Sequence, residues 1–334
     1  LYDDGAHGDG AVADGVFGCM FPPQKSPGVW YCLAGAGDSS DRLKYSLPQV
    51  FQVTARRTEY RALWVDAWNP GLLMPEQARA MVNTARAANM NAIIVQVRKT
   101  GDALYRSSIE PRASELKDPA YDPLKTVIDL AHDTSGGKKR LEVHAWVVVY
   151  RIYRTGRNGK FPDAPHILGK RPQWASVNDK GEKSDEGSLY LDPGVPEVTD
   201  YTIDVCLDIV KKYNVDGINF DYIRYPQGGW GFNPTAIERF RRLNNRTATP
   251  ARTDTQWRAF LREQVTFFLR KAYVKLTAER PSLKVSVCTI GWGDIRNNDF
   301  QTGDPWREGI QDWAEWNKLG ILDVNFRMGY KRQS

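Results

Sequence analysis

The chain has 334 residues, of which 41% are hydrophobic and 26% charged, and its formal net charge is +6. This composition is typical of a globular protein, and no apolar run approaches the roughly 18 residues that a membrane-spanning helix needs. Lysines and arginines are scattered among acidic and aromatic residues rather than gathered in a stripe, so we do not expect nucleic-acid binding. The length fits one α/β barrel with a small additional module.

Residues 1–54 differ from the rest of the chain in their pattern of turn-forming and strand-forming residues. Aspartate–glycine turns precede two strand-like runs at 16–21 and 29–34, and residues 51–54 resemble a last strand. This pattern predicts part of an Ig-like β-sandwich, because a whole one needs about seven strands. We expect residues 55–58 to link this part to the remaining chain.

Two features of this first part leave alternatives open. Asp3, Asp9 and Asp14 could bind calcium, but the EF-hand pattern with its closing glutamate is absent, and ordinary turn chemistry explains them better. Cys19 and Cys32 flank a predicted hairpin and could form a disulfide if the protein is exported.

From residue 59 onward the pattern alternates between strands and helices. We predict strands at 61–68, 91–98, 141–150, 215–220, 284–290 and 321–327, and helices near 75–88, 123–132, 195–213, 254–279 and 306–319, with a further helix starting at Asn233-Pro234. Such alternation indicates a parallel sheet covered by helices.

Alternate residues within these strands differ in polarity, and successive side chains of a strand point to opposite faces. One set is apolar and is expected to lie under helices; it includes Val95, Val97, Val147, Ile218, Phe220, Val287, Val324 and Phe326. The other set is polar or aromatic: Trp64, Asp66, Trp68, Gln96, Arg98, His144, Trp146, Asn219, Asp221, Asn325 and Arg327. A closed barrel can place the second set in an interior that opens into a site, whereas an open sheet with helices on both faces cannot easily bury it. We therefore predict a TIM-type (β/α)8 barrel, in which Arg98 or Arg327 pairs with Asp66 or Asp221.

The most informative stretch is residues 215–226. Asn219 and Asp221 lie two positions apart and share one side of the predicted strand, and Tyr222 and Arg224 crowd its exit. A carboxylate at the carboxyl end of a parallel strand is where α/β enzymes place catalytic groups. The alternative is an acidic residue satisfied by a neighbouring arginine.

Several stretches of the chain form one ordered set of motifs: Arg-Ala-Leu-Trp-Val-Asp-Ala-Trp at 61–68, Asn-Ala-Ile-Ile-Val-Gln-Val-Arg at 91–98, Gly-Asp-Ala-Leu-Tyr at 101–105, Glu-Val-His-Ala-Trp at 142–146, Leu-Asp-Pro at 191–193, residues 215–226, and Ile-Leu-Asp at 321–323 leading to Met-Gly-Tyr-Lys-Arg at 328–332. In these stretches, residues from about 59 to 334 resemble the bacterial glycosyl-hydrolase-like 10 family. The chain departs from the family by having Arg327 where the family has proline. It also stops after strand six, so the resemblance implies a barrel whose strands seven and eight are missing or supplied by another segment.

The resemblance implies a glycoside hydrolase that acts with two carboxyl groups. Asp221 is the first candidate for the base or nucleophile, and Asp66, Asp102 and Asp294 are candidates for its partner. The candidates for substrate binding are Arg98, Asn219, His144, Gln96, Tyr222 and Arg224, with Trp68, Trp230 and Trp292 as sugar-stacking platforms, while Trp64 and Trp146 are assigned to packing. We expect no metal or other cofactor, since no second histidine stands at metal-ligand spacing from His144.

The expected substrate is a bacterial or environmental polysaccharide, with peptidoglycan strands or another amino-sugar polymer as candidates. The missing initiator methionine, the Ig-like part and the carbohydrate-type barrel predict an exported bacterial protein, extracellular or on the cell surface. The alternatives are a barrel that binds glycan without cleaving it and a cell-surface scaffold component.

Overall fold

The structure is a computed structural model of the chain, and it describes residues 4–6, 11–13, 59–155, 160–293, 295–297 and 299–330, with the backbone of four short strands between residues 28 and 53. The chain divides into two compact units, Leu1–Glu59 and Tyr60–Ser334. In the described residues, no helix has the length and apolar character needed to cross a membrane.

The first unit contains two antiparallel strand pairs. β1 (Gly28–Cys32) pairs with β4 (Gln49–Val53), and β2 (Gly35–Gly37) pairs with β3 (Leu43–Tyr45). The predicted strand at 16–21, the three aspartates considered for calcium and the thiol considered for pairing with Cys32 lie outside the described residues. The Ig-like assignment, the calcium alternative and the disulfide therefore stay predictions.

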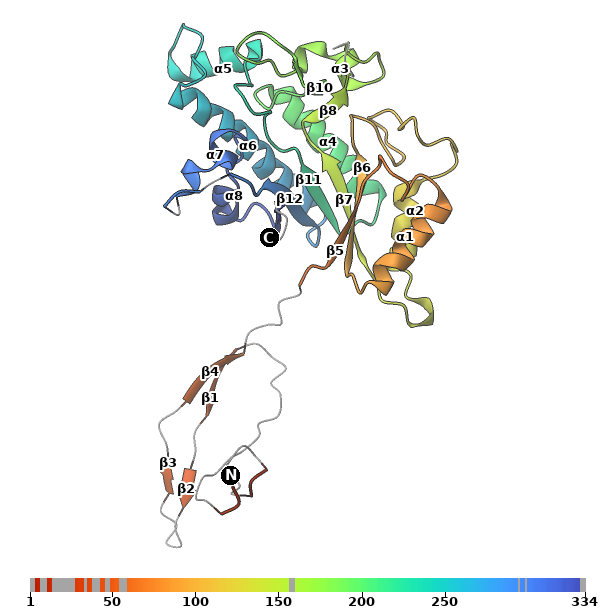
Figure 1. Cartoon of the computed structure of the whole chain (residues 1–334), viewed down its shortest axis with the longest axis vertical. Helices are drawn as coiled ribbons and strands as arrows, with labels where there is room; N and C mark the ends of the chain where they lie inside the picture. The colour runs from red at the N-terminus through yellow and green to blue at the C-terminus, as the bar shows by residue number, and fades with distance from the viewer. Residues whose placement is uncertain are drawn as a thin grey trace. The chain divides into compact units, whose positions relative to one another are not determined.

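The second unit is built on a curled, six-stranded parallel sheet (Figure 1). Its strands follow chain order from one edge to the other, and each neighbouring pair is parallel: β5 (Ala62–Val65), β6 (Ala92–Arg98), β7 (Glu142–Val148), β11 (Gly217–Asp221), β12 (Lys284–Ile290) and β13 (Val324–Met328). This order confirms the predicted α/β class, because each crossover returns the chain to the next position in the sheet. β5 and β13 are the edge strands.

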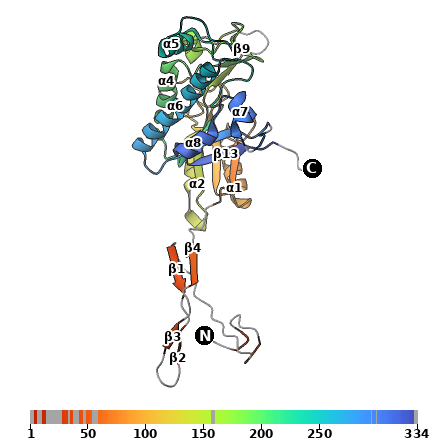
Figure 2. The same cartoon turned by 90° about the vertical axis from the view of Figure 1, so that its left-hand side faces the viewer.

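Helices connect the strands (Figure 2), and several of them start with proline at the first helical position, where the missing N–H costs no hydrogen bond. They are α1 (Pro75–Ala87), α2 (Pro123–His132), α3 (Ile167–Lys170), α4 (Pro196–Lys212), α5 (Pro234–Asn244), α6 (Thr255–Glu279), α7 (Asp304–Arg307) and α8 (Trp313–Leu319). The helix predicted at 306–319 is interrupted, because Ile310 has a φ of 51°, which is incompatible with a right-handed helix.

The segment between β7 and α4 contains a small antiparallel sheet that the sequence did not predict. β10 (Ser188–Tyr190) lies between β8 (Arg151–Arg154) and β9 (Ser184–Asp185). Because β8 begins three residues after β7 ends, this sheet starts at the carboxyl end of the parallel sheet.

The two faces of the parallel sheet differ as predicted in its central strands. Phe220 packs against Phe268 of α6, with ring centroids 5.4 Å apart, so its side of β11 lies under a helix. On the other face the Asn219 side chain donates to Ser286 Oγ at 2.9 Å and accepts a hydrogen bond from Cys288 Sγ at 3.3 Å. The buried Asn219 side chain is therefore satisfied within the sheet, as buried polar groups generally are.

The prediction fails at β13, where Phe326 was expected to lie under helices. Its ring packs against Trp64 at a centroid distance of 4.8 Å and lines a cavity on the concave face. The register explains the error, because Phe326 pairs with Cys288, which lies on the same face as Asn219. The concave face is thus more aromatic than the sequence pattern indicated.

Candidate active site

Asp221 is the last residue of β11 and lies at the carboxyl end of the sheet, with 6% of its surface exposed. Trp146 of the neighbouring strand donates through Nε1 to Asp221 Oδ2 at 3.2 Å, and the Tyr222 backbone N–H donates to Oδ1 at 2.7 Å. Arg224 Nη1 lies 3.9 Å from Oδ1. These contacts fix the orientation of the carboxylate while leaving part of it accessible.

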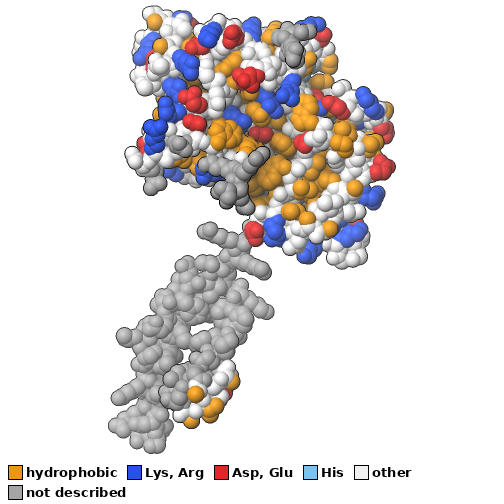
Figure 3. All heavy atoms as spheres, in the orientation of Figure 1, with side chains coloured by type: hydrophobic (Ala, Val, Ile, Leu, Met, Phe, Trp, Pro, Cys, Tyr) orange, Lys and Arg blue, Asp and Glu red, His pale blue; other side chains and the backbone are white. Residues whose placement is uncertain are grey.

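Two cavities adjoin this carboxylate on the concave side of the sheet. One of about 260 Å³ is lined by Trp68, Gln96, Trp146, Arg151, Asp221, Tyr222, Arg224, Trp292, Met328 and Tyr330. The other, of about 340 Å³, is lined by Trp64, Trp146, Asp221, Cys288, Phe326, Arg327, Met328, Gly329 and Tyr330. Hydrophobic side chains gather in a hollow on this side of the unit (Figure 3). In the described part of the chain, Asp221 is the acidic residue that lines either cavity.

Tyr222 forms a cationic and aromatic stack next to Asp221. Its φ of 49° lies in the left-handed region, which residues with a Cβ rarely adopt and which often marks a functional position. The guanidinium carbons of Arg151 and Arg224 lie 3.7 and 4.2 Å from its ring centroid, and Arg151 Nη1 also donates to its hydroxyl at 2.5 Å. The site therefore combines one carboxylate with two arginines.

Exposed aromatic rings surround the same cavity. Trp68 is 46% exposed and Tyr330 is 82% exposed, and the Trp292 and Tyr330 rings stack at 6.5 Å with an interplanar angle of 26°. The Lys99 ammonium lies 4.4 Å from the Trp68 ring centroid. Flat, partly wet aromatic faces of this kind suit contact with the apolar face of a sugar ring.

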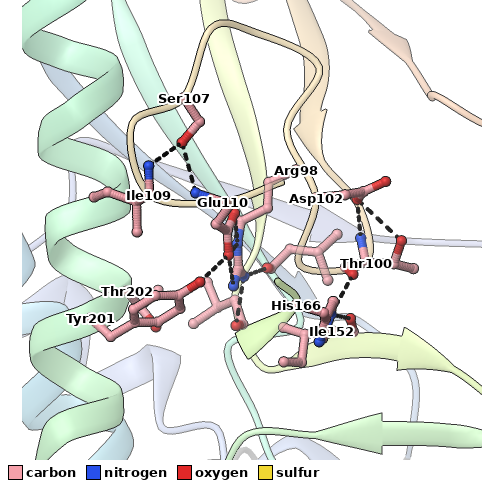
Figure 4. A network of polar contacts seen from close by, with 12 residues as sticks. Arg98, Thr100, Asp102, Ser107, Ile109, Glu110, Ile152, His166, Tyr201 and Thr202 are labelled. Carbon is pink, nitrogen blue, oxygen red and sulfur yellow. Dashed lines mark hydrogen bonds and ion pairs between the residues drawn. The ribbon is translucent and has the colours of Figure 1, made fainter. Parts of the chain in front are cut away.

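Arg98 does not reach the site, and the predicted pairing with Asp66 or Asp221 is wrong. It is fully buried, and its Nε and Nη2 donate to the Glu110 carboxylate at 2.8–2.9 Å (Figure 4). Its Nη1 donates to the carbonyls of Val148 and Val149, the latter at 3.0 Å. Sequence spacing could not identify this partner, because Glu110 lies in an irregular loop.

The carboxylates of Asp102 and Asp66 each stabilise a turn by accepting hydrogen bonds from nearby backbone N–H groups. Asp102 accepts hydrogen bonds from the Thr100 N–H at 2.9 Å and the Thr100 hydroxyl at 3.1 Å, and burial raises its pKa (Figure 4). Asp66 accepts from the N–H groups of Trp68 and Asn69 at 2.8 and 2.9 Å. Burial raises the pKa of Asp66, but hydrogen bonds led by the Asn69 side chain outweigh that effect and lower it. Neither residue lines the cavities at Asp221.

Three other predicted binding residues are placed elsewhere. His144 is fully buried in the amino-terminal half of β7, where its Nε2 lies 3.1 Å from Glu142 Oε2. Asn219 is engaged inside the sheet, as described above. Trp230 is only 6% exposed and packs against Tyr190 at 6.5 Å. Asp294 lies outside the described residues.

Among the predicted residues, the structure places Gln96, Tyr222, Arg224, Trp68 and Trp292 around one cavity with Asp221. It adds residues that sequence reasoning missed or assigned to packing, namely Trp146, Trp64, Arg151, Met328 and Tyr330. The strand alternation that placed Asn219 and Asp221 on one face also places Trp146 there, so that signal was available. Arg151 follows β7 in a segment without periodicity and carried no such signal. Among the described residues, no group of three or more His, Cys, Asp or Glu side chains is arranged to hold a metal ion.

A family model described as "Glycosyl hydrolase-like 10" matches residues 59–332. The chain belongs to the glycosyl hydrolase-like 10 family. Curated relatives include "Glycosyl hydrolase YngK" of Bacillus subtilis, 27% identical over 288 residues, and "Glycosyl hydrolase DigH" of Escherichia coli, 26% identical over 273 residues. The matches cover 79% and 78% of this chain but only 52% and 59% of these relatives, so the chain spans between half and three fifths of their length.

Solved structures support the fold of this glycosyl hydrolase-like 10 chain. An α-L-fucosidase isoenzyme from Paenibacillus thiaminolyticus matches with a TM-score of 0.53 and 17% identity, over 74% of this chain and 35% of that one. The PgaB (BpsB) glycoside hydrolase domain from Bordetella bronchiseptica matches with a TM-score of 0.54 and 14% identity, over 80% of this chain and 74% of that one. At these identities the likeness shows the fold alone.

Proposed function

We propose that this protein is a glycoside hydrolase that cleaves a polysaccharide and that Asp221 is its essential carboxylate. The observation that carries the proposal is the position of Asp221, at the carboxyl end of a central parallel strand, facing two cavities edged by aromatic rings. The family of the chain and the printed names of its relatives agree with this reaction class.

In this proposal Asp221 acts on the anomeric carbon, either directly as nucleophile or by taking a proton from the attacking water. The N–H groups of Trp146 and Tyr222 keep its carboxylate aimed at one position. A second carboxyl group protonates the oxygen of the leaving sugar. Asp66 and Asp102 remain candidates for that acid, although each already stabilises a turn and neither lines the cavities at Asp221.

We also propose that the six-stranded sheet is part of a (β/α)8 barrel whose two further strands pair with β5 and β13. Each of these edge strands carries backbone N–H and C=O groups with no neighbouring strand in the sheet. A chain extended beyond residue 334 should protect the amides of Val324–Met328 from hydrogen exchange. Unchanged exchange at these amides in the longer protein would contradict the barrel.

For the substrate we propose an anionic or amino-sugar polymer, with peptidoglycan strands as one candidate. Support comes from the net charge of +6 and from Arg151 and Arg224 beside Asp221. Such a polymer would be met outside the cytoplasm, so we propose an exported protein. Recovery of the native protein from the cytoplasmic fraction alone would refute this location.

The test of the reaction compares the wild-type protein with Asp221→Asn, which keeps the shape of the side chain and removes its ionisable group. Reducing ends are measured across a glycan panel beside thermal melting curves. Loss of one catalytic carboxyl should lower the rate by roughly 10²–10⁴-fold with little change in melting temperature. Asp129→Asn, at an exposed surface pair with Lys125, is the matched control and should keep full activity. A loss of activity no larger than the loss of folded protein would show that Asp221 is only a structural counter-ion.

The second candidate function is binding of glycan without cleavage. Its support is that, within the described lining, Asp221 has no second carboxylate beside it. Calorimetry with the same glycans separates the two functions. Binding that survives Asp221→Asn, together with no reducing ends from the wild-type protein, would favour the binding function, and cleavage by the wild-type protein would exclude it.

A further inference from the structure

A second pocket, distinct from the cavities at Asp221, lies at the amino-terminal end of α6 beside the loop that follows β11. Its lining shares no residue with those cavities and includes Arg252, Arg258 and Arg307, with Glu308 as the acidic residue among the described ones. The arginines come from the residues just before α6, from its first turns and from α7. The enclosed space is about 20 Å³, which is enough for one small group and too little for a sugar ring.

The positive charges at this pocket are only partly neutralised by the described part of the protein, through Glu308. There, Arg252, Arg258 and Arg307 form no side-chain hydrogen bond and have no carboxylate within 4.0 Å. Burial lowers the pKa of Arg258, Glu308 raises it, and the charges of Arg252 and Arg307 lower it further, so the four groups lie close enough to interact. Arg258 is half-buried, and Glu308, which lies more than 4.0 Å from its guanidinium nitrogens, only partly offsets the cost of removing this charge from water.

The next turn of α6 adds to this imbalance. Arg262 stands four residues after Arg258 and packs on Trp306, with its guanidinium carbon 3.6 Å from the ring centroid. Burial, followed by the charge of Arg258, lowers the pKa of Arg262 to about 10. Like charges at this spacing on a helix repel each other. Asp312 partly offsets the charge of Arg262, and Glu308 partly offsets that of Arg258, so the remaining positive charge would attract an added anion.

Two further features point to a ligand. Trp257 lines the pocket, and its indole nitrogen is buried without a hydrogen-bond partner in the described structure. A buried, unpaired donor of this kind usually has an ion or water as its partner. Gly229, at a φ of 91°, packs on Arg252 so closely that a Cβ would lie 2.8 Å from Arg252 Cδ, which restrains that arginine against the loop.

We propose that this pocket binds a dianionic phosphoryl group, either free inorganic phosphate or a phosphate monoester carried by a sugar. Three arginines and one glutamate give +3 − 1 = +2, which matches the charge of such a group. Guanidinium groups bind phosphate oxygens through paired hydrogen bonds, which favours arginine over lysine at such a site. The enclosed space of about 20 Å³ holds one oxygen of the phosphoryl group, and the rest of the group, with any attached sugar, lies at the open mouth of the pocket.

The test uses the full chain and measures melting temperature and calorimetric binding with inorganic phosphate, glucose 1-phosphate and glucose, at ionic strength matched with sodium chloride. The wild-type protein should bind phosphate and melt higher in it than in chloride. Arg258→Gln and the exposed Arg307→Gln should each weaken binding at least tenfold. The control Arg79→Gln, an exposed arginine on α1, should bind as the wild type does. Without phosphate, Arg258→Gln should melt no lower than the wild type, because it removes a charge that is only partly neutralised.

Tighter binding of glucose 1-phosphate than of phosphate would assign a sugar phosphate as the ligand, and binding of phosphate alone would assign the free ion. Equal stabilisation by phosphate and chloride, or unchanged binding in both arginine variants, would overturn the proposal. So would an Arg258→Gln variant destabilised equally with and without phosphate, since that would indicate a purely structural role. No glycan is cleaved in these measurements, and Asp221→Asn should bind phosphate normally, so the result is independent of the proposed hydrolase activity.

Discussion

Glu110→Gln tests whether Arg98 is a structural residue rather than a substrate-binding one. In the wild-type protein the side chains of Arg98 and Glu110 are both completely buried. Glu110 accepts three hydrogen bonds from Arg98 and one from Tyr201, whose hydroxyl lies 2.8 Å from Oε1. The substitution keeps the shape of the side chain and removes the only carboxylate paired with this arginine in the described structure.

The expected loss follows from the burial of the pair. Removing one partner of a buried ion pair leaves an uncompensated charge and typically costs about 3–5 kcal/mol of unfolding free energy. Tyr201→Phe removes only one hydrogen bond to a charged acceptor, so its loss should be about 2 kcal/mol. The double variant Arg98→Met with Glu110→Leu removes both charges and should recover most of the loss, since apolar replacement of a buried pair is often close to neutral.

Urea unfolding followed by tryptophan fluorescence measures these differences, because the chain has 11 tryptophans. Arg98 also holds the carbonyls of Val148 and Val149, and the Val149 N–H donates to the Asp221 carbonyl at 2.8 Å. Because Arg98 touches this backbone and not the cavity itself, the activity of Glu110→Gln should fall in proportion to its folded fraction. A loss of stability below about 1 kcal/mol, or a double variant as unstable as the single one, would refute the assignment of an essential buried pair.

Three other predictions concern pH and substrate contact. Burial raises the pKa of Asp192 from 3.8 to about 6, so the unfolded chain loses this proton first, and the free energy of unfolding should fall by up to about 3 kcal/mol as pH rises from about 3 to about 7. Urea titrations of Asp192→Asn should lack this slope. Burial raises the pKa of Glu142, but hydrogen bonds from His144 and Lys284 outweigh the effect of burial and lower this pKa to about 2. The free energy of unfolding should therefore be highest above pH 4.5 and should decline by up to about 2 kcal/mol as pH falls towards 2. Glu142→Gln should show less acid sensitivity in the same titration, and an unchanged slope would contradict the assignment. Trp68→Ala should raise the KM for a cleaved glycan by roughly tenfold with a nearly unchanged melting temperature, because an exposed ring contributes stacking rather than core packing; an unaltered KM would remove Trp68 from the binding surface.

Strand positions and the location of Asp221 could be predicted because they depend on local pattern. Residues 215–220 alternate in a way that only a strand satisfies, and the carboxyl end of such a strand lies at the edge where parallel sheets present their loops. The same alternation correctly separated Asn219 from Phe220. It failed for Phe326, since two-residue periodicity does not say which of the two faces is the concave one at an edge strand.

Charge partners could not be predicted in this way. Arg98 and Asp221 stand on one predicted face, yet Arg98 pairs with Glu110, twelve residues further along the chain in a loop without periodicity. His144 shares that face as well, but the pairing of His144 with Gly217 places it four residues before the level of Asp221, which is paired with Val148. Two side chains on the same face of the sheet therefore need not lie in the same site, because their positions along the strands decide which end of the sheet each one is near.

The sequence by itself determined the α/β class, the order of strands and helices, and the placement of Asp221 at a strand end, because these follow from backbone periodicity and local turn chemistry. Tertiary structure decided which of the candidate side chains surround that carboxylate, and it added others that the sequence pattern did not indicate. Arg151, which follows β7, and Tyr330, which follows β13, come from separate regions of the chain and meet Asp221 only because the sheet curls and its loops fold over one end. Contacts between distant segments depend on the register of the strands and on the conformation of the loops, and neither can be predicted from the local pattern of residues.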